Sequence, residues 1–308
     1  MDDVDACAIP GRDPRPVRSY GNGLIRCCTE RGVAVITLNR PARRNALNRE
    51  MLVALREALA DLGTCTDAAV VVFTGAGSAF CSGVDISADG RSTFYRPPQQ
   101  TERLYQEHGQ DIVRAFQSLQ HITIAAVNGP AVGWGTCLAT CCDFRVVSES
   151  AFFRIPEIGF GMYYDVGCLY GLLALVGPAQ ARRMTMLGED ISAIEALRIG
   201  LADNVVPAAT LMSATDRLAR RLLTRSSATL LNTKRRLHAM TVARHKPLGI
   251  IELELTTAYY GANQDRHEGV AAFMEGRRPQ FSREPGADTL TPSQRRGEGG
   301  ESHGLPSD

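Results

Sequence analysis

The chain has 308 residues, of which 44% are hydrophobic, enough for one large domain with a sizeable core. Its 34 basic and 33 acidic residues nearly cancel, which excludes a global attraction to nucleic acid or to an anionic membrane surface. No apolar run approaches the ~20 residues that a membrane-spanning helix needs. The nine cysteines form no paired Cys-x-x-Cys set, so we expect no metal site and a reduced, cytoplasmic protein.

The N-terminal half of the chain predicts a mixed α/β core. Residues 1–22 combine charges and prolines without periodicity and are expected to form a flexible arm. Two β-rich runs, Leu24–Thr29 and Val33–Leu38, then predict a hairpin. Asn48 is suited to cap a helix, because leucines follow it at helical spacing. These are Leu52, Leu55, Leu59 and Leu62.

Three short apolar runs predict further buried strands, at Val70–Phe73, Ile122–Val127 and Phe144–Val147. A helix around Ile112–Leu119 separates the first two. Strands that alternate with helices indicate a mostly parallel sheet with right-handed crossovers. Residues 23–205 are therefore predicted to form the α/β core that carries the active site.

The C-terminal third reads as helical. Ser192 and Glu195 have the spacing of a capping box, and Gly200 is placed to end the helix that they begin. Leu211–Leu223, Ala228–Leu237 and Leu248–Tyr260 are predicted helices of a region spanning 206–282. Within it, the basic run at Lys234 is expected to form a solvated helix face. Residues 283–308 are rich in Gly, Ser and Pro and are expected to be disordered.

Two loops rich in small residues follow buried strands. The stretch Phe80–Asp85 allows a ligand to approach the backbone closely, although an ordinary strand–helix turn would look the same. The stretch Asn128–Thr136 leads into a helix N-terminus, which presents unpaired N–H groups. Its spacing fits neither a dinucleotide fingerprint nor a P-loop. A site for a developing oxyanion is therefore the better interpretation.

A third stretch supplies candidate acids. Glu157 and Asp165 lie eight residues apart among apolar and aromatic residues. A carboxylate that is desolvated in such surroundings has a raised pKa and exchanges protons near neutral pH. Structural roles are the alternative, with Glu157 capping a turn and Asp165 capping the following helix.

Together, these stretches resemble the crotonase family of enoyl-CoA hydratases and isomerases, over about Val33 to Phe281. The similarity is carried by Leu-Asn-Arg-Pro at 38–41, Asn-Ala-Leu-Asn at 45–48, Phe-Cys-Ser-Gly-Val-Asp at 80–85, Ala-Ala-Val-Asn-Gly at 125–129 and Pro-Glu-Ile-Gly at 156–159. Ser192 to Ala202, Glu268 to Phe273 and Arg277 to Phe281 complete it.

The resemblance implies a fold class and a substrate. It implies an α/β spiral of ββα units with a helical C-terminal region that packs homotrimers, often paired into hexamers. It implies a thioester substrate on coenzyme A or on an acyl carrier, with no cofactor beyond the coenzyme A of the substrate. Two backbone N–H groups, of Ser82 and Trp134, would polarise the thioester carbonyl. We also expect substrate contacts from the following residues. They are Arg43, Arg44, Gly83, Asp85, Gly133, Cys137 and Tyr164.

The proton-handling positions depart from the family's hydratases. Those enzymes resemble this chain at Glu157, but Cys137 stands where they carry their other glutamate. The isomerases of the family place an acid where Asp165 stands. We therefore expect Glu157 and Asp165 to move a proton along an unsaturated acyl chain. The alternatives are a hydratase, another thioester lyase or hydrolase, and a non-catalytic thioester-binding scaffold.

Overall fold

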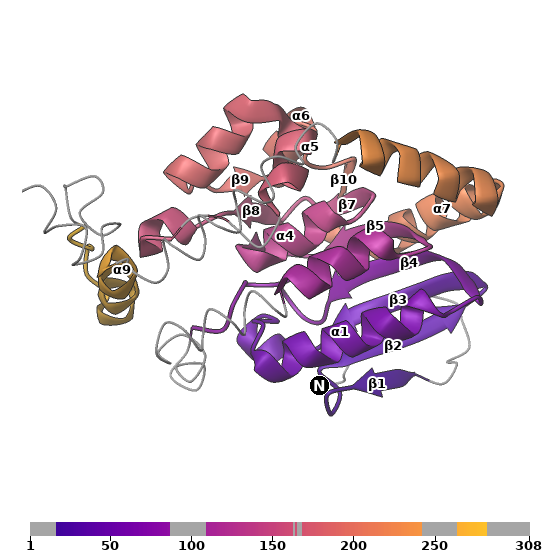
Figure 1. The fold of residues 1–308 in the computed structure, drawn as a ribbon, viewed down its shortest axis with the longest axis horizontal. Coiled ribbons are helices and arrows are strands. Elements are labelled where there is room, and N and C mark those ends of the chain that lie inside the picture. Colours follow the sequence, from indigo (N-terminus) through magenta and orange to yellow (C-terminus); the bar gives the residue numbers. More distant parts are fainter. Residues whose placement is uncertain (1–16, 87–108, 163, 165–167, 242–263, 282–308) are drawn as a thin grey trace, which may run out of the picture.

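The computed structural model describes residues 17–86, 109–162, 164, 168–241 and 264–281. These residues form a mixed α/β fold with a central sheet and helices around it (Figure 1). The predicted helix Leu248–Tyr260 and the candidate acid Asp165 lie outside the described residues. Among the described helices, none combines the length and the apolar character that crossing a bilayer requires.

The central sheet has seven strands in the order β1-β2-β3-β4-β5-β7-β10. The first three strands are antiparallel neighbours, and the pairs from β3 to β10 are parallel. The predicted hairpin and the mostly parallel sheet are therefore confirmed. The strands are Arg18–Tyr20 (β1), Ile25–Glu30 (β2), Gly32–Leu38 (β3), Ala68–Gly75 (β4), Ile122–Val127 (β5), Phe144–Ser148 (β7) and Asn204–Val206 (β10).

A second, three-stranded sheet stands beside the first in the order β6-β8-β9. Its strands are Ala131–Val132 (β6), Phe152–Arg154 (β8) and Ile191–Ser192 (β9). Strand β6 pairs in parallel with β8, with Ala131 opposite Phe153. This pairing brings the loop after β5 next to the segment after β8, which are the two stretches that carry the predicted oxyanion donor and acid.

The central strands bury both faces, because successive side chains point to opposite sides of a sheet. Ile36, Val71 and Phe73 pack into one apolar cluster with helix α1 (Arg49–Gly63) and with helical residues 109–118. Val35 and Val72, their neighbours in sequence, pack into a second cluster with α7 (Leu211–Leu223). The alternation explains why these strands read as continuous apolar runs.

The remaining helical elements lie around the second sheet and at the ends of the molecule. They are η1 (Pro41–Arg43), α4 (Trp134–Cys141), η2 (Glu157–Phe160), α5 (Leu169–Arg182), η3 (Arg183–Leu187), α6 (Ala193–Arg198), η4 (Ala208–Thr210), helical residues 227–241 and α9 (Gln264–Glu275).

Two predicted helix starts have the expected side-chain caps. The Oδ1 atom of Asn48 accepts a hydrogen bond from the N–H of Met51 at 3.0 Å, at the start of α1. The Oγ atom of Ser192 accepts from the N–H of Glu195 at 3.3 Å, at the start of α6. The Glu195 carboxylate, however, binds Arg183 and Arg198. The capping box is therefore confirmed in its serine half.

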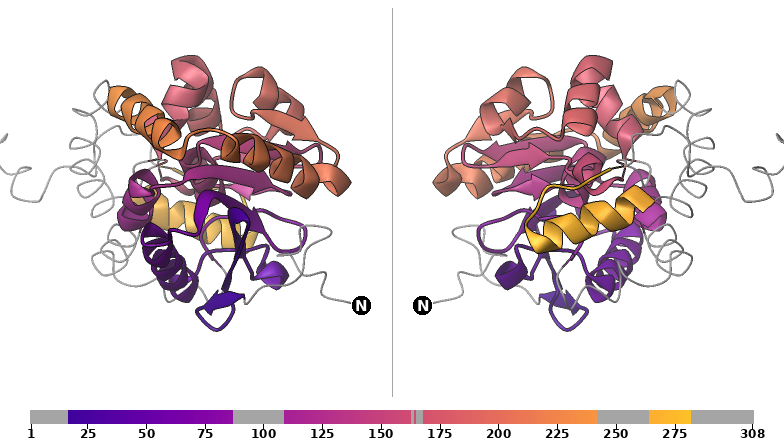
Figure 2. Two further views of the ribbon diagram at one scale, coloured as in Figure 1. Left: turned by 90° about the vertical axis from the view of Figure 1, so that its right-hand side faces the viewer. Right: turned by 90° about the vertical axis from the view of Figure 1, so that its left-hand side faces the viewer.

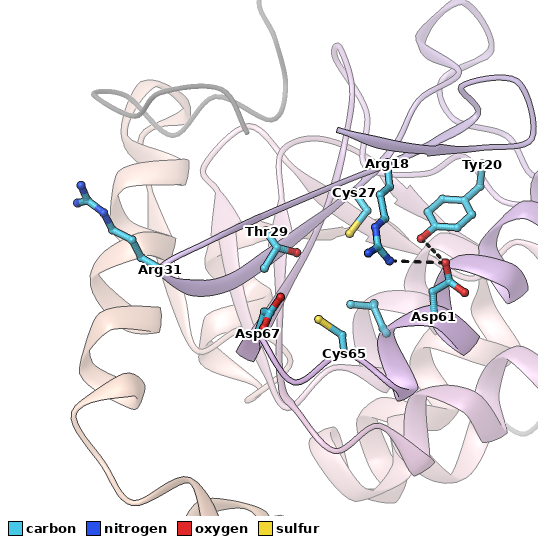
Figure 3. Close-up of a pocket in the computed structure, with 9 residues that line it drawn as sticks. Arg18, Tyr20, Cys27, Thr29, Arg31, Asp61, Cys65 and Asp67 are labelled. Carbon is cyan, nitrogen blue, oxygen red and sulfur yellow. Dashed lines mark hydrogen bonds and ion pairs between the residues drawn. The ribbon is translucent and has the colours of Figure 1, made fainter. Parts of the chain in front are cut away.

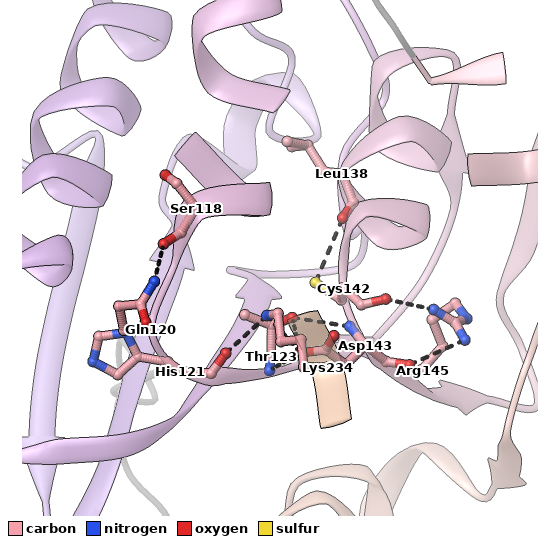
Figure 4. A network of polar contacts seen from close by, with 9 residues as sticks. All are labelled: Ser118, Gln120, His121, Thr123, Leu138, Cys142, Asp143, Arg145 and Lys234. Atoms are coloured by element: carbon pink, nitrogen blue, oxygen red, sulfur yellow. Dashed lines mark hydrogen bonds and ion pairs between the residues drawn. The ribbon is translucent and has the colours of Figure 1, made fainter. Parts of the chain in front are cut away.

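Lys234 departs from the predicted solvated helix face. Its Nζ atom donates to the carboxylate of Asp143 and to the carbonyl oxygen of His121, both at 2.8 Å (Figure 4). Only 13% of the side chain is exposed. The same carboxylate accepts from the N–H of Thr123 at 2.8 Å, so Lys234 helps to fasten helical residues 227–241 to the start of β5. The following residue, Arg235, is exposed.

Helix α9 lies across one end of the molecule and covers η2 (Figure 2). The rings of Phe160 and Phe273 meet edge to face, with centroids 5.1 Å apart. Gly269 approaches the backbone of Phe160 so closely that a β-carbon would lie 2.6 Å from its Cα atom. The C-terminal region therefore supports the segment that begins at Glu157, whereas its role in trimer packing stays a prediction.

The contact between α4 and the loop after β4 predicts a strong effect of one added methyl group. A β-carbon on Gly135 would overlap the carbonyl oxygen of Cys81, and neither is the end of a flexible side chain. We expect Gly135→Ala to lower the free energy of unfolding by roughly 1–3 kcal/mol through overpacking, measured by urea denaturation. Gly63→Ala at the end of α1 is the control, since nothing lies within 4 Å of its added carbon. Equal urea midpoints for the two variants would contradict the tight contact.

Candidate active site

The loop after β4 is held by the side chain of Asn45, which is fully buried. Its Nδ2 atom donates to the carbonyl oxygens of Ala76 at 2.9 Å and Ala79 at 2.8 Å. Its Oδ1 atom accepts from the N–H of Arg40 at 2.9 Å. Asn45 has a φ of +56°, in the left-handed region that asparagine tolerates better than most residues. One amide therefore joins residues 40–45 to the loop.

A second asparagine braces the same loop from the end of β5. The Oδ1 atom of Asn128 accepts from the N–H of Gly75 at 3.1 Å, and its Nδ2 atom donates to the carbonyl oxygen of Gly77 at 2.9 Å. The next residue is Gly129, where a β-carbon would collide with the backbone of Ser78. The loops that follow β4 and β5 are thus locked against each other.

Ser82 does not offer the free N–H group that the sequence predicted, because this N–H donates to the carbonyl oxygen of Arg44 at 3.0 Å. Two residues later, Val84 forms a parallel bridge with Leu47. In that bridge the N–H of Leu47 donates to the carbonyl oxygen of Gly83, and the N–H of Asp85 donates to the carbonyl oxygen of Leu47. Because the residues on either side of Val84 make these bonds, the N–H of Val84 itself points away from Leu47. Val84 therefore has the available amide, and the motif alone carries no signal that separates it from Ser82.

Gly83 and Trp134 bring the two small-residue loops together. Gly83 has a φ of +89°, and a β-carbon there would lie 3.7 Å from the amide nitrogen of Trp134. Trp134 is the first residue of α4, so its N–H belongs to the first turn, where helical amides lack an intrahelical acceptor. Its indole is buried, with 6% of the residue exposed. The amides of Val84 and Trp134 thus belong to adjoining stretches of backbone.

Glu157 lies directly against the glycine-rich loop. A β-carbon on Gly133 would be 2.6 Å from its Oε1 atom, so the carboxylate occupies the space that a side chain at this position would fill. Gly133 also has a φ of +52°, which disfavours any other residue. Its N–H donates to the carbonyl oxygen of Arg154 at 2.8 Å, which continues the β6–β8 pairing toward Glu157. The predicted acid and the predicted oxyanion loop are therefore neighbours.

Cys137 has a role that the sequence did not predict. It forms a disulfide with Cys168, and their Cα atoms are 5.4 Å apart. A disulfide sulfur has no proton to exchange, so Cys137 neither replaces the missing glutamate nor offers a thiol to the substrate. The expectation of nine reduced cysteines is wrong at this pair. The two cysteines lie 31 residues apart, and their spacing gives no signal of the pairing.

Asp85 contacts Arg40, and this contact determines what its carboxylate does. The Nη1 atom of Arg40 and the Oδ2 atom of Asp85 are 2.5 Å apart, and 5% of the aspartate side chain is exposed. Arg40 also donates to the carbonyl oxygen of Ala46 at 3.1 Å. The Asp85 carboxylate therefore holds the loop that contains Val84. Its contact with Arg40 explains the burial of this carboxylate without the predicted contact with substrate.

The other predicted contacts are spread over the surface and the core. Arg43 and Arg44 are exposed at η1, beside the loop containing Ser82, where they are accessible to an anionic group. Tyr164 is buried, with 4% exposed. The structure therefore brings together Gly83, Trp134, Gly133 and Glu157, with the two arginines on the adjoining surface.

A separate pocket lies between the first strands and the end of α1 (Figure 3). The hydroxyl of Tyr20 donates to Asp61 at 2.9 Å inside it, and Arg18 lies 3.9 Å from the same carboxylate. Burial, and then the contact with Asp61, raise the pKa of Tyr20 to about 12. None of the predicted site residues lines this pocket, so it does not belong to the candidate active site.

Comparison with protein families supports one assignment of this arrangement. Residues 28–284 match the family model for enoyl-CoA hydratase/isomerase. A probable enoyl-CoA hydratase of Mycobacterium bovis is 37% identical over 262 residues, which cover 81% of this chain and 89% of that protein. A crotonyl-CoA hydratase of Syntrophomonas wolfei is 32% identical over 265 residues, covering 85% and 98%.

Solved structures give the same picture. A crystal structure of an enoyl-CoA hydratase from Mycobacterium avium subsp. paratuberculosis superposes with a TM-score of 0.74 and 29% identity, covering 84% of this chain and 98% of that one. A monofunctional enoyl-CoA isomerase from Mycobacterium smegmatis superposes with a TM-score of 0.60 and 33% identity, covering 71% and 93%. This chain is therefore similar to hydratases and also to an isomerase.

The buried amide of Asn45 predicts a stability effect that an exposed asparagine should lack. Asn45→Asp removes the Nδ2 donor and places a charge against the carbonyl oxygens of Ala76 and Ala79. We expect it to lower the free energy of unfolding by roughly 2–4 kcal/mol, measured by urea denaturation. Asn232→Asp is the matched control, because Asn232 is exposed on helical residues 227–241. A loss for Asn45→Asp no larger than that of the control would contradict the bracing role.

Proposed function

Because this chain belongs to the enoyl-CoA hydratase/isomerase family, we propose that it shifts a carbon–carbon double bond in an acyl-CoA thioester through an enolate intermediate. The observation that carries the proposal is the position of Glu157 against Gly133, next to the amide of Trp134. A base in that place is adjacent to the group that would hold the thioester oxygen. The enzyme needs no cofactor for this chemistry, because coenzyme A belongs to the substrate.

The N–H groups of Val84 and Trp134 are the proposed oxyanion donors. The Ser82 N–H is replaced in this role because it already donates to Arg44. Negative charge grows on the thioester oxygen when a neighbouring carbon loses its proton, and fixed amides stabilise that charge without reorganising. Removing one such donor typically costs about 10²–10³-fold in kcat. Arg43 and Arg44, exposed beside this loop, are proposed to bind the phosphates of coenzyme A.

Glu157 is the proposed base. Its carboxylate takes a proton from a carbon of the acyl chain, and the electron pair of that C–H bond moves into the enolate. The reverse transfer at a carbon further along leaves the double bond in its new place. Asp165 is proposed as the second acid on its sequence position alone, eight residues after Glu157.

Hydration of a double bond is the second candidate, favoured by the similarity of this chain to relatives such as the crotonyl-CoA hydratase of Syntrophomonas wolfei. Activation of water between two carboxylates would need an acid where Cys137 stands, and this cysteine is bonded to Cys168. Proton transfer by Glu157 alone has no such requirement. We therefore place the isomerase function before the hydratase function.

The proposed base predicts the effect of one isosteric substitution. Glu157→Gln keeps the shape of the side chain but removes the proton acceptor, so kcat with 3-hexenoyl-CoA should fall by about 10²–10⁴-fold with little change in KM. Glu149→Gln, at an exposed glutamate, should leave both values unchanged. The same assay on Asp165→Asn tests the second acid. If both acid variants turn over at the parent rate, neither residue carries the proton.

Incubation with 3-hexenoyl-CoA and with crotonyl-CoA in D₂O separates the candidate functions. Deuterium at the α or γ carbon, with a shifted double bond, supports the isomerase. Addition of water to the β carbon of crotonyl-CoA at a higher kcat/KM supports the hydratase and overturns the first choice. Tight binding without exchange or hydration would indicate a non-catalytic thioester-binding protein.

A further inference from the structure

Cys137 and Cys168 connect the candidate active site to its nearest helix by a covalent bond. Cys137 lies in the first half of α4, and Cys168 is the residue directly before α5. Their exposed fractions are 0% and 2%, and their Cα separation of 5.4 Å is ordinary for a disulfide. The bond therefore ties the starts of two helices together inside the core.

A third cysteine, Cys141, lies one helical turn after Cys137 on α4. Its sulfur and those of Cys137 and Cys168 all lie within 4.8 Å of one another. Burial raises the pKa of the Cys141 thiol to about 12, so little of it is thiolate at neutral pH and its exchange with the neighbouring disulfide is slow. Cys141 therefore stays a thiol beside a bonded pair.

The bonded pair is coupled to the proposed catalytic groups through the backbone of α4. The N–H of Cys137 donates to the carbonyl oxygen of Gly133 at 3.1 Å, and Gly133 leaves the space that the Glu157 carboxylate fills. Trp134, whose amide is a proposed oxyanion donor, lies three residues before Cys137 and on the same side of the helix. A displacement of Cys137 therefore changes the geometry between Trp134 and Glu157.

Reduction favours such a displacement. Bonded sulfurs are about 2.05 Å apart, whereas atoms that are not bonded need a separation of about 3.5–4 Å. The surrounding core is close-packed, so a cysteine side chain that rotates displaces its neighbours, and we expect the two helix starts to shift to make that room. A misplacement of about 1 Å in an active site costs up to 10²-fold in rate.

We propose that Cys137 and Cys168 form a redox-modification site that controls this active site, with the disulfide as the active form and the dithiol as the less active form. The effect on rate rests on the proposed function of Glu157; the redox chemistry does not. One thiolate attacks a low-molecular-weight disulfide, and a mixed disulfide forms as the first small thiol leaves. The second cysteine displaces the other small thiol. Two electrons pass to the oxidant, and both protons end on the released thiols.

The redox chemistry is tested without any substrate. The full chain is equilibrated with mixtures of oxidised and reduced dithiothreitol, the thiols are trapped by alkylation, and the linked peptides are quantified by mass spectrometry. We expect a reversible transition with one midpoint for the Cys137–Cys168 pair, and alkylation of Cys141 only after denaturation. Free Cys137 and Cys168 under all oxidising mixtures would overturn the proposal.

Coupling to the site has a spectroscopic readout that does not depend on activity. Trp134 is the single tryptophan of the chain, so its fluorescence reports the start of α4 alone. Emission should rise on reduction with the same midpoint as the peptide transition, because a nearby disulfide quenches indole. Cys168→Ala and Cys137→Ala should abolish the change. Cys65→Ser, at a half-buried thiol outside the cluster, should retain it. Emission that does not follow the peptide transition would show that the bond is not coupled to α4.

The final arm measures turnover of the same redox samples with 3-hexenoyl-CoA. We expect kcat of the folded dithiol form to be about tenfold lower than that of the disulfide form, and Cys168→Ala to have the lower value in every mixture. Equal kcat values for the two redox forms would show that the disulfide has only a structural role, and would overturn the proposal that it controls activity. Absence of turnover in both forms, with the fluorescence transition intact, would count against the proposed function and not against the redox site.

Discussion

The site depends on the hydrogen bonds by which Asn45 and Asn128 hold the loop after β4. This loop is neither helix nor strand, so its buried carbonyl oxygens have no regular backbone partner. The two amides supply donors to the buried residues Ala76 and Ala79 and to the exposed Gly77. Leaving the carbonyl oxygens of Ala76 and Ala79 without partners would cost about 1–3 kcal/mol each. With these partners in place, the loop carries Gly83 and Val84 to the start of α4, where both candidate oxyanion amides meet.

The periodic parts of this fold could be predicted from the sequence, because burial of a strand or a helix face imposes a repeat. The predicted strand Ile122–Val127 and the predicted helix Leu211–Leu223 have the observed bounds. The oxyanion donor could not be predicted in the same way. Whether an amide in an extended loop faces the site or a neighbour alternates along the chain, and here the bridge to Leu47 decides it. Ser82 and Val84 are equally plausible until that bridge is known.

Cys137 shows a different limit of sequence reasoning. Its burial is that of a small hydrophobic side chain, since none of the residue is exposed. Its partner could not be found, because that depends on how closely α4 packs against α5. The structure shows this packing at Gly171, where a β-carbon would lie 3.8 Å from the carbonyl oxygen of Thr140. This contact between the two helices brings the cysteines together.

These constraints converge on α4, which has only eight residues. A helix this short is marginal without tertiary contacts, so its position is set by what it touches. Gly135 presses against the carbonyl oxygen of Cys81 on one side, and Cys137 is bonded to Cys168 on another. The N–H of Trp134 therefore has its direction fixed by contacts made further along the helix. Chemistry that relies on backbone donors requires such a fixed helix start. Because the donors are backbone amides, the side chain of Cys137 is not needed for the reaction and can hold the helix in place.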